Sequence, residues 1–127
     1  MTTIVVAAVI EQNGCFLVTR RQSGVHLEGF WEFPGGKCEA REDHASCLAR
    51  ELDEELGVRV RVGEEILSTT HAYPDRSVEL HFRRCDLLGS PRPQLGQEMR
   101  WVAAGDLATL QFPPADTELI QLLRRKR

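Results

Sequence analysis

A hydrophobic run long enough to cross a membrane is missing from this sequence. The continuous apolar stretch Ile4 to Ile10 is far shorter than the 18 or so apolar residues that a transmembrane helix needs, and no basic residue precedes it as in a signal peptide. We therefore expect a cytoplasmic protein that has no membrane partner.

Cysteine pairs at metal-binding spacing are also missing. Four cysteines, Cys15, Cys38, Cys47 and Cys85, form no C-x-x-C motif, so the sequence indicates neither a zinc site nor a redox pair. In the cytoplasm these thiols are expected to stay reduced and to serve as packing residues.

An excess of basic residues is the third absence. Sixteen lysines and arginines stand against 19 aspartates and glutamates, and the formal net charge is −3. A domain that binds a nucleic-acid polymer usually carries a basic face, so we expect no such partner. A small anionic substrate, held by a metal ion and a few arginines, is compatible with this charge.

What the chain does contain suffices for one globular domain. It has 127 residues, of which 42% are hydrophobic, and it shows no internal repeat and no low-complexity tract. This length and composition suit a single hydrophobic core, so we expect residues 1–127 to form one domain. The sequence does not indicate its oligomeric state.

The pattern of apolar residues predicts strands on both sides of an internal helix. Ile4–Ile10 and Cys15–Arg20 flank Asn13-Gly14, a favourable pair for a hairpin turn. Further strands are expected at Val58–Val62, Ile66–Tyr73, Val78–Phe82 and Met99–Ala103. A final helix buries Leu119, Ile120, Leu122 and Leu123. The predicted fold class is α/β, with a mixed sheet between helices.

The internal helix has clear ends and two distinct faces. Asp43 is a good N-cap residue, and Gly57 suits the position that follows the last helical residue. Its buried face is formed by apolar residues at helical spacing: Ala45, Leu48, Ala49, Leu52 and Leu56. Glu54 and Glu55 lie within about 60° on either side of Glu51, so three carboxylates share one stripe beside that face.

Such a stripe favours a bound cation. From Glu42 to Glu55 the chain has six acidic residues and a single base, Arg50, and like charges three or four residues apart cost about 0.2–0.5 kcal/mol per pair. A solvated polar face is the ordinary explanation of a charge run, but such faces usually intersperse lysine with glutamate. The oxygen-rich cluster suits Mg²⁺, with Mn²⁺ as the alternative, rather than Zn²⁺.

The segment from Gly36 to Val58 resembles the Nudix box. The family pattern is Gly, five residues, Glu, seven residues, and then Arg-Glu-apolar-x-Glu-Glu-x-Gly-apolar, and the segment matches it at every specified position. The resemblance implies an α/β/α sandwich with a mixed β-sheet. It also implies hydrolysis of a nucleoside diphosphate linked to another group, with box glutamates that hold Mg²⁺.

The same resemblance implies roles for individual residues of the box. Glu51, Glu54 and Glu55 correspond to metal ligands, and Gly36 lends its carbonyl oxygen. Glu51 and Glu54 are also the catalytic candidates, together with Arg50, which orients the acids. Which carboxylate activates the attacking water is left open.

Segments outside the box resemble the MutT branch of the family, whose members clear 8-oxo-dGTP from the nucleotide pool. The similar segments are Val18–Arg21, Glu32–Gly36, Tyr73–Arg76 and Phe112–Asp116. The resemblance implies nucleotide contacts from Arg21, His26, Phe33, Arg76 and Asp116. Ordinary structural roles are the alternatives: a solvated strand end for Arg21, a surface loop for His26, the core for Phe33 and a helix cap for Asp116.

Asp116 departs from the MutT pattern, in which the stretch Phe-Pro-Pro-Ala is followed by Asn. An Asn side chain donates and accepts hydrogen bonds, whereas an ionised Asp only accepts. Asp116 can accept from the N–H groups of guanine or from the exocyclic amine of cytosine. Family members that act on CTP or 5-methyl-dCTP resemble this chain and carry Asp at that position.

The MutT branch takes one further metal ligand from an acidic residue in the loop before the Trp101-Val102 strand. Glu98 is the nearest acidic residue in this chain and is the candidate ligand. Alignment on the Gly96-Gln97 pair instead places Leu95 at the family's acidic position.

The leading hypothesis is a Mg²⁺-dependent nucleoside triphosphate pyrophosphohydrolase that acts on 8-oxo-dGTP and releases nucleoside monophosphate and pyrophosphate. The alternative enzyme acts on CTP, dCTP or 5-methyl-dCTP. A nucleotide-binding module without turnover is the third hypothesis. Such a module is expected to lack box glutamates or to be joined to a DNA-binding domain, and this chain has neither feature.

Overall fold

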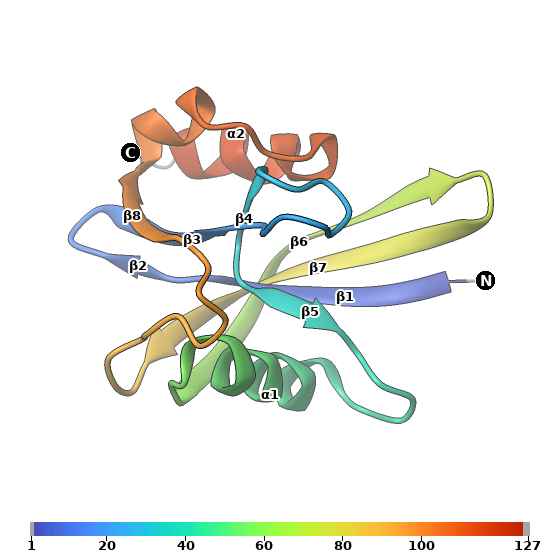
Figure 1. Cartoon of the computed structure of the whole chain (residues 1–127), viewed down its shortest axis with the longest axis horizontal. Coiled ribbons are helices and arrows are strands. Elements are labelled where there is room, and N and C mark those ends of the chain that lie inside the picture. Colours follow the sequence, from blue (N-terminus) through green and yellow to red (C-terminus); the bar gives the residue numbers. More distant parts are fainter. Residues whose placement is uncertain (1, 126–127) are drawn as a thin grey trace.

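The computed structural model describes residues 2–125, and its strands lie between two helices (Figure 1). Helix α1 spans His44–Leu56, and helix α2 spans Thr117–Arg125. Two 3₁₀ helices, η1 (Ala104–Thr109) and η2 (Pro114–Asp116), precede α2. Because α1 covers one side of the strands and α2 the other, the predicted α/β class with a mixed sheet between helices is confirmed.

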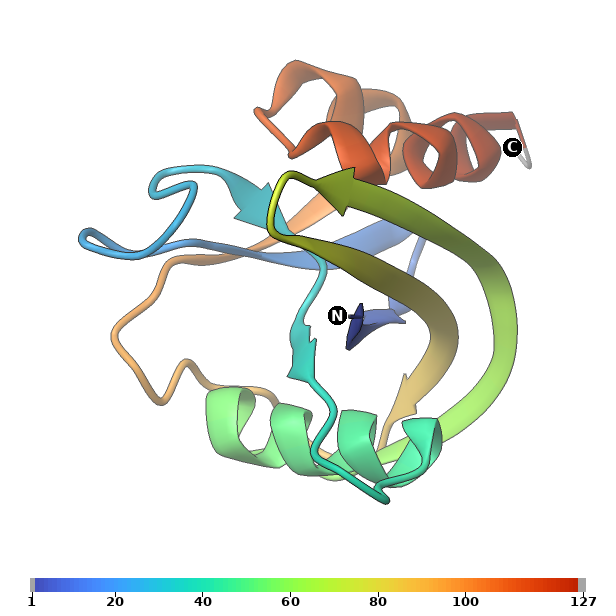
Figure 2. The same cartoon turned by 90° about the vertical axis from the view of Figure 1, so that its right-hand side faces the viewer.

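The strands form two four-stranded sheets. The mixed sheet has the order β5-β1-β7-β6, in which only β1 and β7 are parallel. Its strands are β1 (Thr2–Val9), β5 (Gly35–Lys37), β6 (Val60–Tyr73) and β7 (Arg76–Leu87). The second, antiparallel sheet contains β2 (Glu11–Gln12), β3 (Cys15–Arg20), β4 (Trp31–Glu32) and β8 (Met99–Ala103). Figure 2 shows β6 and β7 curving from the α1 side to the α2 side.

The predicted N-terminal hairpin is present only around its turn. Asn13 and Gly14 have φ values of 52° and 79°, as a tight hairpin turn requires, and β2 pairs with the start of β3. The expected pairing of Ile4–Ile10 with Cys15–Arg20 is wrong, because β1 pairs with β5 and β7 in the other sheet. A continuous apolar run suits this central position, where both faces of the strand are covered.

Two strands expected after α1 are a single strand. Val58–Val62 and Ile66–Tyr73 were predicted separately, but β6 continues through both segments from Val60. Its register with β7 shifts between Val62 and Glu65 and again between Glu65 and Leu67. These irregularities disturb the alternation of side chains, which explains why the sequence pattern breaks where the strand does not.

Helix α1 has the predicted ends. Asp43 is its N-cap, and its carboxylate accepts a hydrogen bond of 2.7 Å from the backbone N–H of Ser46. Gly57 follows the last helical residue with φ of 58°, a left-handed conformation that glycine adopts without strain. The helix is therefore fixed at both ends by its own sequence.

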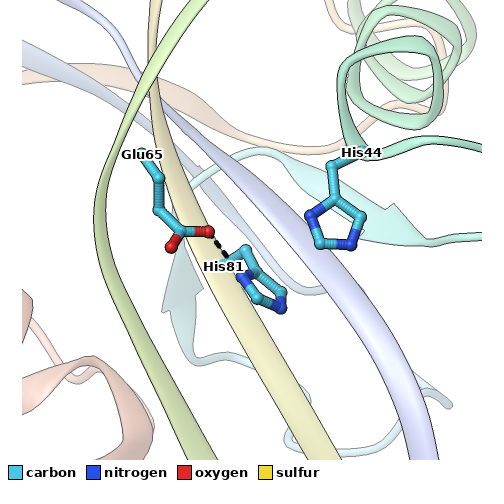
Figure 3. A group of neighbouring side chains, drawn as sticks. All are labelled: His44, Glu65 and His81. Carbon is cyan, nitrogen blue, oxygen red and sulfur yellow. Dashed lines mark hydrogen bonds and ion pairs between the residues drawn. The ribbon is translucent and has the colours of Figure 1, made fainter.

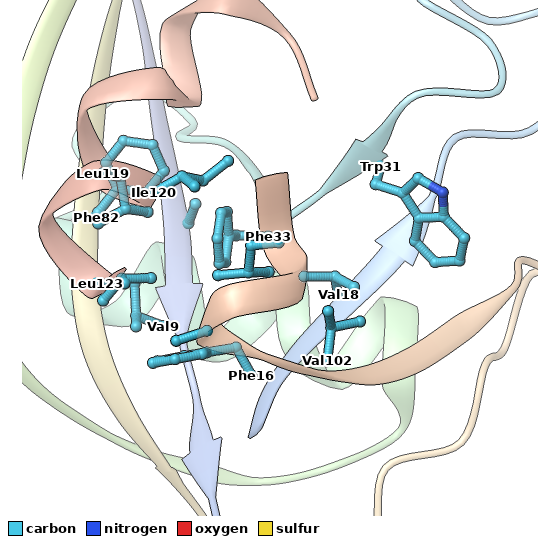
Figure 4. Close-up of a cluster of buried hydrophobic side chains, with 13 residues drawn as sticks. Val9, Phe16, Val18, Trp31, Phe33, Phe82, Val102, Leu119, Ile120 and Leu123 are labelled. Carbon is cyan, nitrogen blue, oxygen red and sulfur yellow. The ribbon is translucent and has the colours of Figure 1, made fainter. Parts of the chain in front are cut away.

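Two hydrophobic clusters lie on opposite faces of the mixed sheet. On one face, Leu48, Leu52 and Leu56 of α1 pack in a cluster with Val6 and Ala8 of β1. The other face carries the cluster shown in Figure 4, which includes Val9, Phe33, Phe82, Leu119 and Leu123. Because successive side chains of a strand point to opposite faces, β1 contributes to both clusters.

Within residues 2–125, no helix has both the length and the apolar character needed to cross a membrane. The four cysteines of the chain are free thiols. Cys47 and Cys85 are buried in the cluster beneath α1, which agrees with the expectation that they serve as packing residues.

Candidate active site

A cleft of about 410 Å³ brings together segments that are far apart in the sequence. Its walls come from β1, β3, β5, α1, the loop before β4, the β6–β7 turn and the segment before α2. All five residues that the MutT resemblance indicates line this cleft: Arg21, His26, Phe33, Arg76 and Asp116. Three residues of the box line it as well: Gly36, Glu51 and Glu55.

Gly36 allows the Glu51 carboxylate to lie directly against β5. A Cβ atom at position 36 would overlap with both carboxylate oxygens of Glu51. Glu51 itself is held by Arg50, whose Nη1 donates a hydrogen bond of 2.9 Å to Oε2. Any side chain at position 36 would therefore displace a carboxylate that the helix and Arg50 both position.

Glu55 lies one helical turn after Glu51 and is largely buried in the same wall. Burial raises the pKa of Glu55 well above its ordinary value, and a hydrogen bond with Glu51 and the negative charge of Glu32 raise it further. Glu55 forms no ion pair with any residue between positions 2 and 125. Its negative form thus lacks a protein partner.

Arg50 connects several acidic residues of the box. Its Nε and Nη2 donate hydrogen bonds of 2.7 and 2.9 Å to the two carboxylate oxygens of Glu42. These bonds, together with one donated by the backbone N–H of Glu39, lower the pKa of Glu42 to about 2. Nη1 donates to Glu51 and, at 3.3 Å, to Glu54. This geometry is suitable for orienting acids, the role that the resemblance implies for Arg50.

Glu54 differs from the other two glutamates of the predicted stripe. Its side chain is 58% exposed, is directed to Arg50, and does not line the cleft. The structure thus places Glu51 and Glu55 together in the wall, with Glu54 beside them on the solvent side.

The donor atoms at this wall fit a hard divalent cation. The side chains of Glu51 and Glu55 offer only oxygen, and oxygen donors are the preferred ligands of Mg²⁺ and Mn²⁺. Burial, followed by the hydrogen bond with Glu51 and the negative charges of neighbouring glutamates, disfavours the ionised form of Glu55 and raises its pKa. A bound cation would offset these charges, so these residues suit a metal of this type.

Arg21 is fixed on the side of the cleft formed by β3 and the following loop. Its Nη1 donates a hydrogen bond of 2.8 Å to Glu32, and its Nε donates to the backbone oxygen of His26. The imidazole of His26 is part of the same lining, on an exposed loop. The guanidinium is therefore held in place in the absence of a ligand.

Phe33 serves both as a core residue and as a wall of the cleft. It is only 4% exposed, and its ring stacks on Phe112 with centroids 5.4 Å apart and meets Phe82 edge-on at 6.0 Å. Both explanations offered for this residue are consequently compatible with its position, since packing against the core holds the ring rigid at the surface of the cleft.

Asp116 is buried, with 6% of its surface exposed, and it also lines the cleft. Burial, followed by the negative charge of Glu32, raises its pKa from 3.8 to about 7. No side chain or backbone N–H in the described part of the chain donates a hydrogen bond to its carboxylate. Asp116 therefore does not cap α2 through its side chain, and its oxygens are available to a ligand.

Arg76 lies at the turn between β6 and β7 and contributes to the cleft from there. Its guanidinium lies over the ring of Tyr73, 5.8 Å from the centroid, and the two residues are paired across the turn. Both line the cleft. This cation–π contact holds the arginine beside the opening.

Glu98, the candidate for a further metal ligand, lies elsewhere. It forms ion pairs with Arg20 at 3.3 Å and with Arg100 at 3.0 Å, and it is not part of the cleft lining. Leu95, which the alternative alignment places at the acidic position, lines the cleft but has no ligand atom in its side chain.

Several polar residues of the cleft were not singled out from the sequence, and three of them, Glu32, Gln97 and Thr19, have notable contacts or burial. Glu32 binds Arg21 and lies near both Glu55 and Asp116, whose pKa values it raises. The sequence indicated Glu32 only as part of Glu32–Gly36, the segment that resembles the MutT branch and from which Phe33 was chosen as the candidate. Gln97 donates a hydrogen bond of 3.0 Å to the backbone oxygen of Glu55.

Thr19 is the third such residue. Its Oγ1 is buried and has no hydrogen-bond partner within the part of the chain that the structure describes. Thr19 lines the cleft, so a ligand or water there would satisfy this hydroxyl. No pattern in the sequence indicated it, because a threonine inside a strand is ordinary.

An α/β sandwich in which glutamates of one helix line a cleft is the architecture that the Nudix resemblance implies. The family model described as the NUDIX domain matches residues 5–122. The chain therefore belongs to the Nudix family, as the residues of its box imply.

Individual relatives refine this assignment. CTP pyrophosphohydrolase of Escherichia coli K12 is 35% identical over 118 residues, which cover 92% of this chain and 87% of that protein. The 8-oxo-dGTP diphosphatase of the same organism is 32% identical over 123 residues, or 96% and 95% of the two chains. The solution structure of the E. coli ORF135 protein has a TM-score of 0.87 and 34% identity, covering 99% of this chain and 93% of that one. Within the family, the chain is MutT-like.

Proposed function

We propose that this protein is a nucleoside triphosphate pyrophosphohydrolase that uses Mg²⁺ and releases nucleoside monophosphate and pyrophosphate. The observation that carries the proposal is one cleft that contains both the paired carboxylates of Glu51 and Glu55 and the unpaired carboxylate of Asp116. The Glu51 and Glu55 carboxylates suit a metal ion that binds phosphate, and the Asp116 carboxylate suits hydrogen bonds to a nucleotide base. The names of the relatives, CTP pyrophosphohydrolase and 8-oxo-dGTP diphosphatase, support the same reaction class.

The chain's own residues would act on the phosphate groups in three ways. Glu51 and Glu55 would hold Mg²⁺, which would supply positive charge to the phosphate oxygens. Arg21 offers a fixed guanidinium to an anion. A box carboxylate, Glu51 or Glu54, takes the proton from the attacking water, and Arg50 keeps both in place through its hydrogen bonds.

For the base, we propose 8-oxo-dGTP as the first substrate. The Watson–Crick edge of guanine presents two N–H donors, and an ionised Asp116 can accept from both. Phe33 contributes a rigid aromatic ring to the lining of the same cleft, and Tyr73 and Arg76 contribute to it from the β6–β7 turn. Removal of this nucleotide would make the protein a sanitiser of the nucleotide pool.

A cytosine nucleotide is the second candidate, and the raised pKa of Asp116 favours it. At a pKa of about 7, the carboxyl group is partly protonated near neutrality and then both donates and accepts. Cytosine presents an acceptor ring nitrogen beside its donor amine, which a protonated carboxyl group matches. CTP, dCTP and 5-methyl-dCTP are the corresponding substrates.

We also propose a setting for this activity. The single domain of residues 1–127 would act in the cytoplasm on free nucleotides, without a nucleic-acid polymer or a membrane as partner. The net charge of −3 supports a small substrate rather than a polyanionic one.

The decisive experiment measures pyrophosphate release from 8-oxo-dGTP, dGTP, CTP, dCTP and 5-methyl-dCTP in the presence of Mg²⁺. Glu54→Gln should lower turnover of every substrate by orders of magnitude while the circular dichroism spectrum stays unchanged. Asp116→Asn should change the order of the substrates by rate, with a smaller effect on the rate measured with the best substrate. Full activity of Glu54→Gln would remove its catalytic role, and an unchanged ranking would remove Asp116 from base recognition.

A further inference from the structure

A second cluster of metal-ligating side chains lies outside the cleft. His44, Glu65 and His81 each offer one ligand atom, and these three atoms lie within 4.8 Å of one another (Figure 3). They come from three elements: His44 begins α1, Glu65 lies in β6 and His81 in β7. None of the three lines the cleft.

His81 is the centre of this cluster. Its side chain is 11% exposed, its Nδ1 lies 2.5 Å from Oε1 of Glu65, and its Nε2 lies 2.7 Å from Oε1 of Glu79. The imidazole of His44 approaches it from α1, with ring centroids 4.3 Å apart. Two carboxylates and two imidazoles thus converge where the helix begins over the sheet.

We propose that His44, Glu65 and His81 form a binding site for a transition-metal ion of the Zn²⁺ type. Two imidazoles and one carboxylate are a ligand set found in zinc sites, and imidazole nitrogen favours such ions over Mg²⁺. The all-oxygen wall of Glu51 and Glu55 has the opposite preference. The two sites therefore select different metals.

Glu79 completes the site without being a ligand. A histidine that binds a metal through one ring nitrogen generally donates its other N–H to a carboxylate or carbonyl, which fixes the tautomer and the orientation of the ring. Glu79 is placed to accept from Nε2 of His81. This assigns Nδ1, on the side of Glu65, to the metal.

The proposed ion would join α1 to the β6–β7 pair. His44 precedes Glu51 by seven residues, which is about 10 Å along a helix, so the second ion is separate from the carboxylates of the cleft. A ligand contributed by each of three elements ties the start of α1 to the sheet. The expected effect is a more stable fold, and the inference does not depend on the proposed function.

Titration calorimetry with ZnCl₂ on the full chain tests this site, with Mg²⁺ in large excess to occupy the carboxylates of the cleft. The wild type should bind one equivalent of Zn²⁺ and unfold at a higher temperature in its presence. His44→Gln and His81→Gln should abolish both effects, and Glu79→Gln should weaken binding about 10–100-fold. His71→Gln, which changes an exposed histidine outside both sites, should leave them unchanged.

Co²⁺ identifies the ligand atoms by absorption spectroscopy. Nitrogen and oxygen coordination should give d–d bands without a sulfur-to-cobalt charge-transfer band, whereas that band would assign the metal to cysteines and overturn the proposal. Absence of Zn²⁺ binding by the wild type, or wild-type affinity in His44→Gln, would overturn it too. Should His81→Gln not fold, His44→Gln on α1 and Glu65→Gln, which changes an exposed residue, decide the test.

Discussion

Asp116 shows how burial changes the chemistry of a single residue. From the sequence, an ionised aspartate that only accepts hydrogen bonds was expected at this position. In the folded chain it is buried without a donor, and its pKa rises to about 7. Near neutrality the group is therefore present in both forms, so one residue can satisfy either a guanine edge or a cytosine edge.

The raised pKa predicts a dependence of stability on pH. An acid whose folded-state pKa exceeds its unfolded value binds more protons in the folded state, so the free energy of unfolding falls as pH rises from 3.8 to about 7. The slope amounts to about 1.4 kcal/mol per pH unit at most. Asp116→Asn should remove the contribution of this residue, so that the free energy of unfolding of the variant falls less than that of the wild type, as measured by urea unfolding at both ends of the interval. Parallel profiles of wild type and variant would contradict the assignment.

Gly36 carries the second prediction at this scale. In Gly36→Ala the new methyl group displaces the Glu51 carboxylate, which is the far end of a flexible side chain, so the fold should persist. Misplacement of a catalytic group by about 1 Å can reduce turnover by about 100-fold. Steady-state rates with Mg²⁺ measure this loss. Gly105→Ala, where an added Cβ meets no atom within 4 Å, is the control and should retain activity.

Helix α1 is the element on which both proposed metal sites depend. Its caps fix its ends, its leucines fix its rotation against the sheet, and Glu51 and Glu55 then lie in the wall of the cleft. His44 at its first turn and Glu51 and Glu55 farther along are presented by the same helix. The orientation of the acids is thus a consequence of apolar packing.

Leu52 tests that dependence. It is fully buried beneath α1, and replacing such a leucine by alanine typically costs about 2–5 kcal/mol. Leu52→Ala should lower the free energy of unfolding by that amount and weaken Mg²⁺-dependent turnover, because the helix loses its fixed position. Leu88→Ala, at a side chain that is 55% exposed, should change neither. Equal destabilisation of both variants would show that α1 is not positioned by this contact.

At the scale of the whole molecule, the cleft is an assembly of distant segments. Residues from β3, α1, the β6–β7 turn and the segment before α2 contribute to the lining of one cleft. A ligand bound between these elements stabilises only the folded state. Its effect should therefore appear in global unfolding as well as in activity.

Mg²⁺ should raise the midpoint of thermal unfolding of the entire chain. At a concentration 100 times its dissociation constant, a ligand specific for the folded state contributes about 2.7 kcal/mol. Scanning calorimetry with and without chelator measures the shift. Glu51→Gln should abolish most of it, and Glu118→Gln, an exposed glutamate of α2, should not. A shift that persists in Glu51→Gln would place the ion elsewhere.

The sequence by itself determined the features that arise from near neighbours in the chain. The Nudix box, the caps at Asp43 and Gly57, the buried leucines and the acidic character of α1 all follow from spacing within about 20 residues. Helical periodicity and capping are local effects, and for this reason the α/β class could be predicted and a metal ion with oxygen ligands could be proposed.

Only the tertiary structure decided which residues meet. In the folded chain, β1 pairs within the mixed sheet and Glu54 is hydrogen-bonded to Arg50. Asp116 is buried without a hydrogen-bond donor, and the rings of His44 and His81 are in contact. These outcomes depend on burial and on contacts between residues far apart in the chain, which a local pattern does not encode. A shifted pKa or a metal-ligand set depends on the surroundings that folding assembles, so it exists only once the chain has folded.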